Sequence, residues 1–177
     1  MAETAPASSG STGSPFWRFS LGFYRQQGVA EACIELQEAA GADVNLLLFL
    51  LWHGAQQRRL SDAEVEWLEQ RIAPWRDRAV VPLRAIRRAL KSPPGLVEPG
   101  AAEVFRTKIK AVELEAERLQ QEAMYDLVRA GLLGEAAPSV AEAARANVAA
   151  YARICRADFA APAVHTVLAA LAKSKVD

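Results

Sequence analysis

The chain has 177 residues, of which 51% are hydrophobic, so it is long enough to build a core without metals or disulfides. Its 21 basic and 21 acidic side chains cancel, which excludes a strong overall attraction to DNA, RNA or an anionic membrane. Cys33 and Cys155 lie far apart without a CxxC pair. Such cysteines are typical of thiols in a reducing compartment, so we expect a cytoplasmic protein.

The N-terminal residues 1–14 are Ala, Ser, Thr, Gly and Pro after the initial Met, with a single Glu. They lack the basic start and apolar centre of a secretory signal, and we expect a disordered tail followed by one helical domain over residues 15–177. The strongest apolar run, Leu46 to Trp52, has seven residues, whereas a helix that crosses a bilayer needs about 20. The run therefore predicts a buried helix and no membrane segment.

Apolar residues recur at intervals of three and four almost everywhere, and no stretch alternates as a strand does, so we predict an all-α fold. Helices are expected over residues 15–26, 29–40 and 44–59, with Pro15 in a first turn, Gly41 at a C-cap and Asp43 at an N-cap. The third helix is apolar on every side at its centre. We expect it to be the central helix of a bundle of about seven or eight helices.

The middle of the chain predicts two helices and a connector. Ser61 and Glu64 have the spacing of a capping box, which opens a helix expected to end near Pro74. The following helix, over residues 75–90, carries an apolar stripe and is kinked or restarted at Pro82. Residues 91–100 contain three prolines and two glycines and predict an irregular connector. This connector is the one internal boundary at which a subdivision is plausible, although we favour a single domain.

A helix of roughly thirty residues is predicted over residues 101–130. At 1.5 Å per residue it would be about 45 Å long, so we expect part of it to project or to pair with a second copy as a homodimer. A second capping box, Ser139 with Glu142, opens the next helix, and the last helix begins near Pro162. The long helix carries a heptad-like apolar seam formed by Phe105, Ile109, Val112, Ala116, Leu119 and Ala123.

Three segments of the first half have a characteristic sequence: residues 16–24 (FWRFSLGFY), residues 43–52 (DVNLLLFLLW), and Trp75-Arg76 leading to Pro82-Leu83-Arg84. Over roughly residues 15–91 they resemble a proteobacterial family of unknown function. The resemblance implies a small, all-helical cytoplasmic protein with a variable C-terminal part. It implies no activity and assigns no catalytic residue.

Five aromatic residues crowd the first helix. Phe16, Phe19 and Phe23 share one helical face, which is typical of core packing, whereas Trp17 and Tyr24 lie on another face. An aromatic pair on a second face favours a pocket or a partner contact. A hypothetical pocket between the first and third helices is lined by Trp17, Tyr24, Asn45, Trp52 and His53.

His53 is the one candidate acid or base in this pocket, because imidazole titrates near neutrality and Asn45 and Gln56 lie in the same helical register. A histidine near the end of a buried helix is more often held by hydrogen bonds and by the helix dipole, so a structural role is the commoner explanation. No serine or cysteine nucleophile stands at a recognisable turn beside it.

The charges are unevenly distributed. Residues 71–91 hold seven basic side chains against one acidic, and residues 31–70 hold eight acidic against two basic. The candidate partner-binding residues fall within about 120° of one helix face; they are Arg76, Arg84, Arg87, Arg88 and Lys91. This basic face is a candidate for binding RNA phosphates or an acidic protein, with solvation and internal ion pairs as the commoner alternatives.

Metal and cofactor motifs are not found. Cys33, His53, Cys155 and His165 lack the close ligand pairs of structural zinc, and there is neither a phosphate-binding glycine loop nor a DNA-specific motif. We therefore predict no metal and no cofactor. The favoured hypothesis is a non-enzymatic helical module that binds a protein or RNA partner through the basic face; the alternative is a small-molecule-binding protein or enzyme that uses the pocket.

Overall fold

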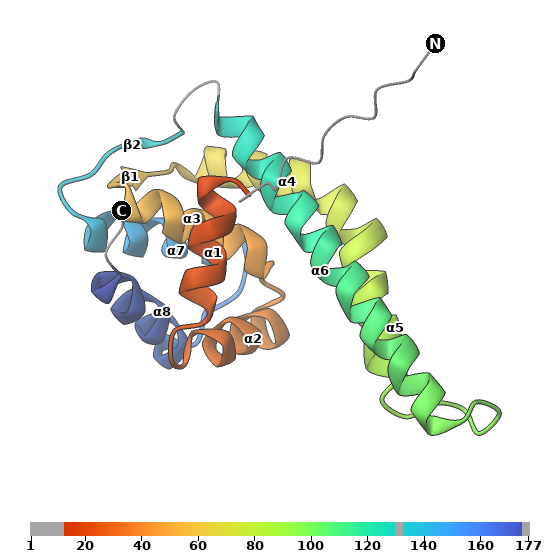
Figure 1. Ribbon diagram of the computed structural model, residues 1–177. Coiled ribbons are helices and arrows are strands. Elements are labelled where there is room, and N and C mark those ends of the chain that lie inside the picture. The colour runs from red at the N-terminus through yellow and green to blue at the C-terminus, as the bar shows by residue number, and fades with distance from the viewer. Residues whose placement is uncertain (1–12, 130–132, 175–177) are drawn as a thin grey trace, which may run out of the picture.

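The protein is described by a computed structural model that covers residues 13–129 and 133–174 (Figure 1). The predicted all-α fold is confirmed, because only two strands of two residues each, β1 (Arg58–Arg59) and β2 (Glu135–Ala136), accompany the helices of these ranges. The eight α-helices are α1 (Pro15–Tyr24), α2 (Val29–Ala40), α3 (Val44–Ala55), α4 (Asp62–Trp75), α5 (Val81–Ala89), α6 (Pro99–Arg129), α7 (Val140–Cys155) and α8 (Ala161–Lys173).

The N-terminal helix begins where its sequence indicates. Pro15 occupies the first turn of α1, and the side chain of Ser14 accepts a hydrogen bond from the backbone N–H of Trp17 at 3.0 Å. Ser14 is buried, so the predicted tail does not extend to this residue. The rest of the predicted tail, apart from Gly13, lies outside the described residues.

Helix α3 is the central helix, as predicted, and ten of its twelve residues are buried. Asp43 caps it by accepting hydrogen bonds from the backbone N–H groups of Asn45 and Leu46. Helices α1, α2 and α7 pack around α3, and α8 packs on α2. The C-terminal helices therefore complete the core that the first seventy-five residues begin.

Helices α3 and α7 cross at a small residue. A Cβ atom at Gly54 would lie 2.7 Å from the Cα atom of Ala144, so only glycine permits this approach. One turn further along α7, Asn147 donates to the carbonyl oxygens of Leu50 and Arg58 and accepts from the backbone N–H of Leu60. This buried amide fixes the chain that leaves α3.

The end of α3 differs from the prediction. The helix was expected to continue to residue 59, but it ends at Ala55, and Gln57 adopts a positive φ of 55°. Arg58 and Arg59 then pair antiparallel with Ala136 and Glu135. Helical periodicity does not predict this pairing, because it joins segments that are distant in sequence.

Helices α4 and α5 are joined by a π-helical turn, η1 (Arg76–Val80). The capping box of Ser61 and Glu64 is present at the start of α4. The helix ends at Trp75, one residue after the predicted end near Pro74. The π turn immediately precedes Pro82, whose ring and missing N–H disfavour a regular α-helical turn at that place. The apolar stripe of residues 75–90 continues into α5, but none of the residues of α5 is fully buried.

Helix α6 runs antiparallel to α4 and α5 (Figure 1). Together these helices form a hairpin that projects from the body of the protein. The predicted seam faces the core only in part: Ala116 is buried, but Phe105, Val112 and Leu119 are about half exposed. The side chains that face the protein include the polar Glu113, Gln120 and Gln121. They can be buried because each finds polar partners on the neighbouring helices. Among the described residues, no helix is both long and apolar enough to cross a membrane.

Candidate functional site

A cleft of about 520 Å³ lies where the hairpin meets the body of the protein, between α1, α2 and α3 on one side and α5 and α6 on the other. Three of the five predicted pocket residues line it, namely Trp17, Tyr24 and Asn45. Three members of the predicted basic face line it too, namely Arg84, Arg87 and Arg88. The two candidate sites of the sequence therefore meet in one cleft.

The other two predicted pocket residues lie elsewhere. His53 is 2% exposed, and its Nδ1 lies 3.1 Å from the carbonyl oxygen of Phe49. Burial lowers the pKa of His53 to about 4, so the ring is neutral at physiological pH. Trp52 packs against the rings of Phe16, Phe49 and Tyr125. The structure thus assigns both side chains to the core and not to the cleft.

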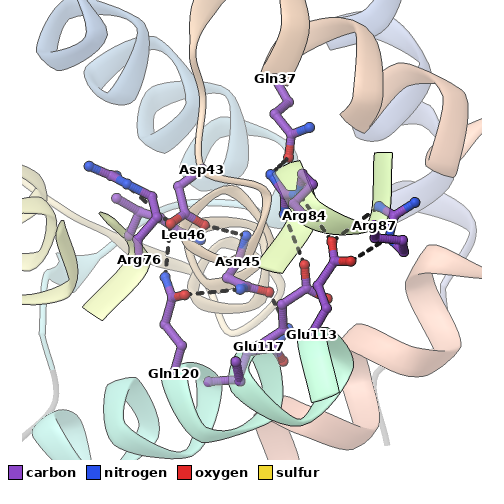
Figure 2. Close-up of polar contacts among 12 residues, drawn as sticks. Gln37, Asp43, Asn45, Leu46, Arg76, Arg84, Arg87, Glu113, Glu117 and Gln120 are labelled. Carbon is purple, nitrogen blue, oxygen red and sulfur yellow. Dashed lines mark hydrogen bonds and ion pairs between the residues drawn. The ribbon is translucent and has the colours of Figure 1, made fainter. Parts of the chain in front are cut away.

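Arg84 joins three helices at one end of the cleft (Figure 2). Its Nε donates to Glu113 at 3.2 Å, its Nη2 donates to Glu117 at 2.9 Å, and its Nη1 donates to Gln37 of α2. Arg87 donates through Nε and Nη2 to the same carboxylate of Glu113. Two arginines of α5 therefore hold two carboxylates of α6.

The two carboxylates differ in their acidity. Burial raises the pKa of a carboxyl group, but the hydrogen bonds and charges of Arg87 and Arg84 hold the pKa of Glu113 below its ordinary value. Burial dominates at Glu117, where Arg84 compensates only in part and the pKa is raised. Such a divergent pair can serve as an acid and a base, but here both groups are engaged by arginine.

The other members of the basic face are Arg76, Arg88 and Lys91. Arg76 pairs with Glu69 at 2.6 Å and with Asp77 at 2.9 Å, and Arg88 pairs with Glu38 at 3.0 Å. Lys91 is exposed just after α5. Internal ion pairs with the acidic side chains of residues 31–70 were one of the alternatives for the basic face. Arg76 and Arg88 form such ion pairs. The pairs of Arg84 and Arg87 with α6 were not anticipated.

A relay of side-chain amides crosses from α3 to α6 beside the cleft (Figure 2). Gln120 donates to Asp43 at 2.8 Å, Asn45 donates to Gln120 at 3.3 Å, and Gln121 donates to Asn45 at 2.8 Å. Asn45 was predicted as a pocket residue. Gln120 and Gln121 were missed, because adjacent glutamines on a long helix are normally solvated, and only the apolar residues around them hint at burial.

Two buried oxygen atoms of cleft-lining residues have no hydrogen-bond partner among the described residues, namely Ser20 Oγ and Gln121 Oε1. Both residues are 3% exposed. Most buried polar atoms in proteins have a hydrogen-bond partner, so two buried oxygen atoms without a partner beside one cleft are unusual. Within the described part of the chain, no group of three or more His, Cys, Asp or Glu side chains is arranged to hold a metal ion.

Comparison with curated proteins and with solved structures found no match. A family model described as "Protein of unknown function (DUF2390)" matches residues 15–124. This range extends beyond the motifs of residues 15–91 and includes every residue that lines the cleft. Because the match covers more than half of the chain, the protein belongs to this family of unknown function.

Proposed function

We propose that this protein is a non-enzymatic interaction module that binds another protein molecule through the outer face of α6, and that a second copy of the chain is the partner specified by this face. One observation carries the proposal. Of the eleven large hydrophobic side chains that are exposed within the described residues, ten lie between Trp75 and Leu119, in or next to the projecting hairpin. Exposed apolar side chains that gather in one region mark interaction surfaces.

The apolar side chains of α6 have the spacing that a partner helix requires. Phe105, Val112 and Leu119 are seven residues apart, lie on one face, and are 52%, 52% and 44% exposed. Leu119 also lines a groove with Trp75 of α4. We define these three side chains of α6 as the outer ridge. A ridge with this heptad repeat fits between the side chains of a second helix.

The charges beside the outer ridge favour a second copy in antiparallel orientation. A two-fold axis at Val112 would set Phe105 of one copy against Leu119 of the other. Lys108 lies four residues before Val112, and Glu115 lies three residues after it. In the antiparallel pair Lys108 of each copy would lie close to Glu115 of the other copy. Two pairs of opposite charges would therefore form across the interface, which supports self-recognition.

The internal ion pairs of Arg76, Arg84, Arg87 and Arg88 make the basic face a weaker candidate for RNA binding. RNA binding would show itself as a steep loss of affinity with salt.

The two thiols are free, and burial raises the pKa of Cys33 to about 12. Unpaired cysteines support the proposal that this is a protein of the cytoplasm, and the resemblance to a proteobacterial family supports a bacterial origin.

Sedimentation equilibrium of the full-length protein tests the proposal. We expect a dimer, and we expect Val112→Glu to yield a monomer because it would bring two carboxylates together at the two-fold axis. Thr107→Glu is the matched control, since it adds the same charge about 140° around α6, and it is expected to remain a dimer. Circular dichroism would establish that both variants stay helical.

A charge exchange tests the antiparallel arrangement. Lys108→Glu is expected to weaken the dimer, and the double variant Lys108→Glu with Glu115→Lys is expected to restore it. A full-length protein that stays monomeric at high micromolar concentration would disprove the second copy as partner. Binding of RNA that weakens steeply with salt would favour the basic face instead.

A further inference from the structure

We infer that the cleft between α1 and the hairpin binds a small aromatic anion that carries N–H donors, the chemistry of a nucleotide. This inference goes beyond the proposed function, because it concerns the inner side of the hairpin and not the outer ridge. It is independent of self-association. Three features of the cleft support it: an oriented amide relay, two aromatic rings without ring partners, and basic side chains at one end.

The amide relay has a fixed direction. The carboxylate of Asp43 can only accept hydrogen bonds, so Gln120 turns its NH₂ group to Asp43 and its oxygen to Asn45. Asn45 then turns its oxygen to the NH₂ group of Gln121. The relay ends at Gln121 Oε1, which accepts no hydrogen bond from any described residue. This end calls for a ligand that brings an N–H or O–H group.

Ser20 supplies a second polar group in the same place. It lies on the side of α1 that lines the cleft, and its hydroxyl group lacks a partner among the described residues. An unsatisfied buried polar atom costs about 1 to 3 kcal/mol. Ser20 and Gln121 line the cleft from different helices, α1 and α6, so both unsatisfied oxygens belong to residues that border the space a ligand would occupy.

Aromatic rings line the cleft near these oxygens. Trp17 and Tyr24 are half-buried on the face of α1 that also carries Ser20. Neither makes a ring contact with another described aromatic side chain, whereas Phe16, Phe19 and Phe23 of the same helix do. Apolar side chains of Leu21, Val44 and Leu48 also line the cleft. The surface favours a flat, largely apolar ligand.

Beside the ion pairs of Glu113 and Glu117, the cleft also carries basic groups that are not fully engaged. Lys110 makes no ion pair with a described residue, and Nη1 of Arg87 donates to none of them. Both side chains line the cleft. Lys110 and Gln121 are eleven residues apart on α6, so their Cα atoms are about 16 Å apart. A cleft of about 520 Å³ accommodates a nucleotide monophosphate.

Isothermal titration calorimetry with adenosine monophosphate as the probe tests the inference. We expect binding that is about tenfold tighter than that of purine riboside monophosphate, which lacks the amino group that would donate to Gln121 Oε1. Ribose 5-phosphate, which lacks the base, is expected to bind more weakly still. Equal binding of adenosine monophosphate and ribose 5-phosphate would overturn the inference, as would the absence of binding at millimolar concentration.

Two variants locate the site. Gln121→Met is expected to abolish the preference for the amino group, while Gln56→Met, a matched change at the far end of α3, leaves it intact. Ser20→Ala is expected to weaken binding severalfold without lowering the thermal unfolding midpoint, because it removes an oxygen that lacks a protein partner. Binding that neither Gln121→Met nor Ser20→Ala alters would contradict the inference. Val112→Glu should retain binding whether or not the protein dimerises.

Discussion

Glu113 and Glu117 lie one turn apart on α6 and share the guanidinium group of Arg84, at 3.2 and 2.9 Å, yet their pKa values move in opposite directions. Glu113 also receives both hydrogen bonds of Arg87, whereas Glu117 has Arg84 alone. At Glu113 the two arginines together outweigh the cost of burial, whereas at Glu117 Arg84 alone does not. We therefore expect the same substitution, glutamate to glutamine, to affect the stability of the protein differently at Glu113 and at Glu117.

Glu113→Gln is expected to destabilise the protein by about 1 to 2 kcal/mol at pH 7, because it removes the charge that compensates two partly buried arginines. The pKa of Glu113 is lowered by folding, so its contribution is present above the unfolded pKa and is lost as the pH falls through the folded one. Urea denaturation at pH 7 measures the loss. A Glu113→Gln protein of unchanged stability would contradict the pairing.

Glu117→Gln is expected to leave the stability at pH 7 unchanged or to raise it slightly. The pKa of Glu117 is raised by folding, so its contribution is present below the unfolded pKa and is lost as the pH rises through the folded one. A neutral amide avoids the cost of burying the carboxylate at neutral pH. The same urea experiment would contradict this if Glu117→Gln were as destabilising as Glu113→Gln.

Asn45→Ala is expected to destabilise the protein by about 2 to 3 kcal/mol, because it interrupts the amide relay and leaves Gln120 and Gln121 with unpaired buried groups. The control is Gln56→Ala, which removes an amide whose hydrogen bond is exposed. Guanidinium denaturation compares the two variants. Equal, small effects would show that the relay does not stabilise the contact between α3 and α6.

His53 is expected to make the protein sensitive to acid. Folding lowers its pKa from 6.5 to about 4, so its contribution to stability is present above pH 6.5 and is lost as the pH falls toward 4. The difference corresponds to about 3 kcal/mol. His53→Gln should flatten the stability profile between pH 6.5 and 4, and His165→Gln, at an exposed position of α8, is the control substitution.

The sequence predicts the local features well. Asp43, Ser61 and Ser139 cap the helices that they were expected to cap, because capping depends on residues within one turn. The orientation of α6 could not be predicted. Its apolar seam was expected to project in part or to pair with a second copy, but the burial of the polar Glu113 and Gln120 was not anticipated. Their burial depends on partners contributed by α3 and α5, and periodicity within α6 carries no information about those partners.

Gly54 and Gly22 allow a paired test of the crossing of α3 and α7. At Gly54 an added methyl group would lie 2.7 Å from the Cα atom of Ala144, a backbone atom that cannot move aside without separating the helices. We therefore expect Gly54→Ala to destabilise the protein by about 2 kcal/mol or more. At Gly22, in α1, nothing lies within 4 Å of the added carbon, so Gly22→Ala is expected to stabilise by up to about 1 kcal/mol through its higher helix propensity. Thermal unfolding of both variants provides the measurement. If the two substitutions shifted the midpoint in the same direction, the close approach of α3 and α7 at Gly54 would be wrong.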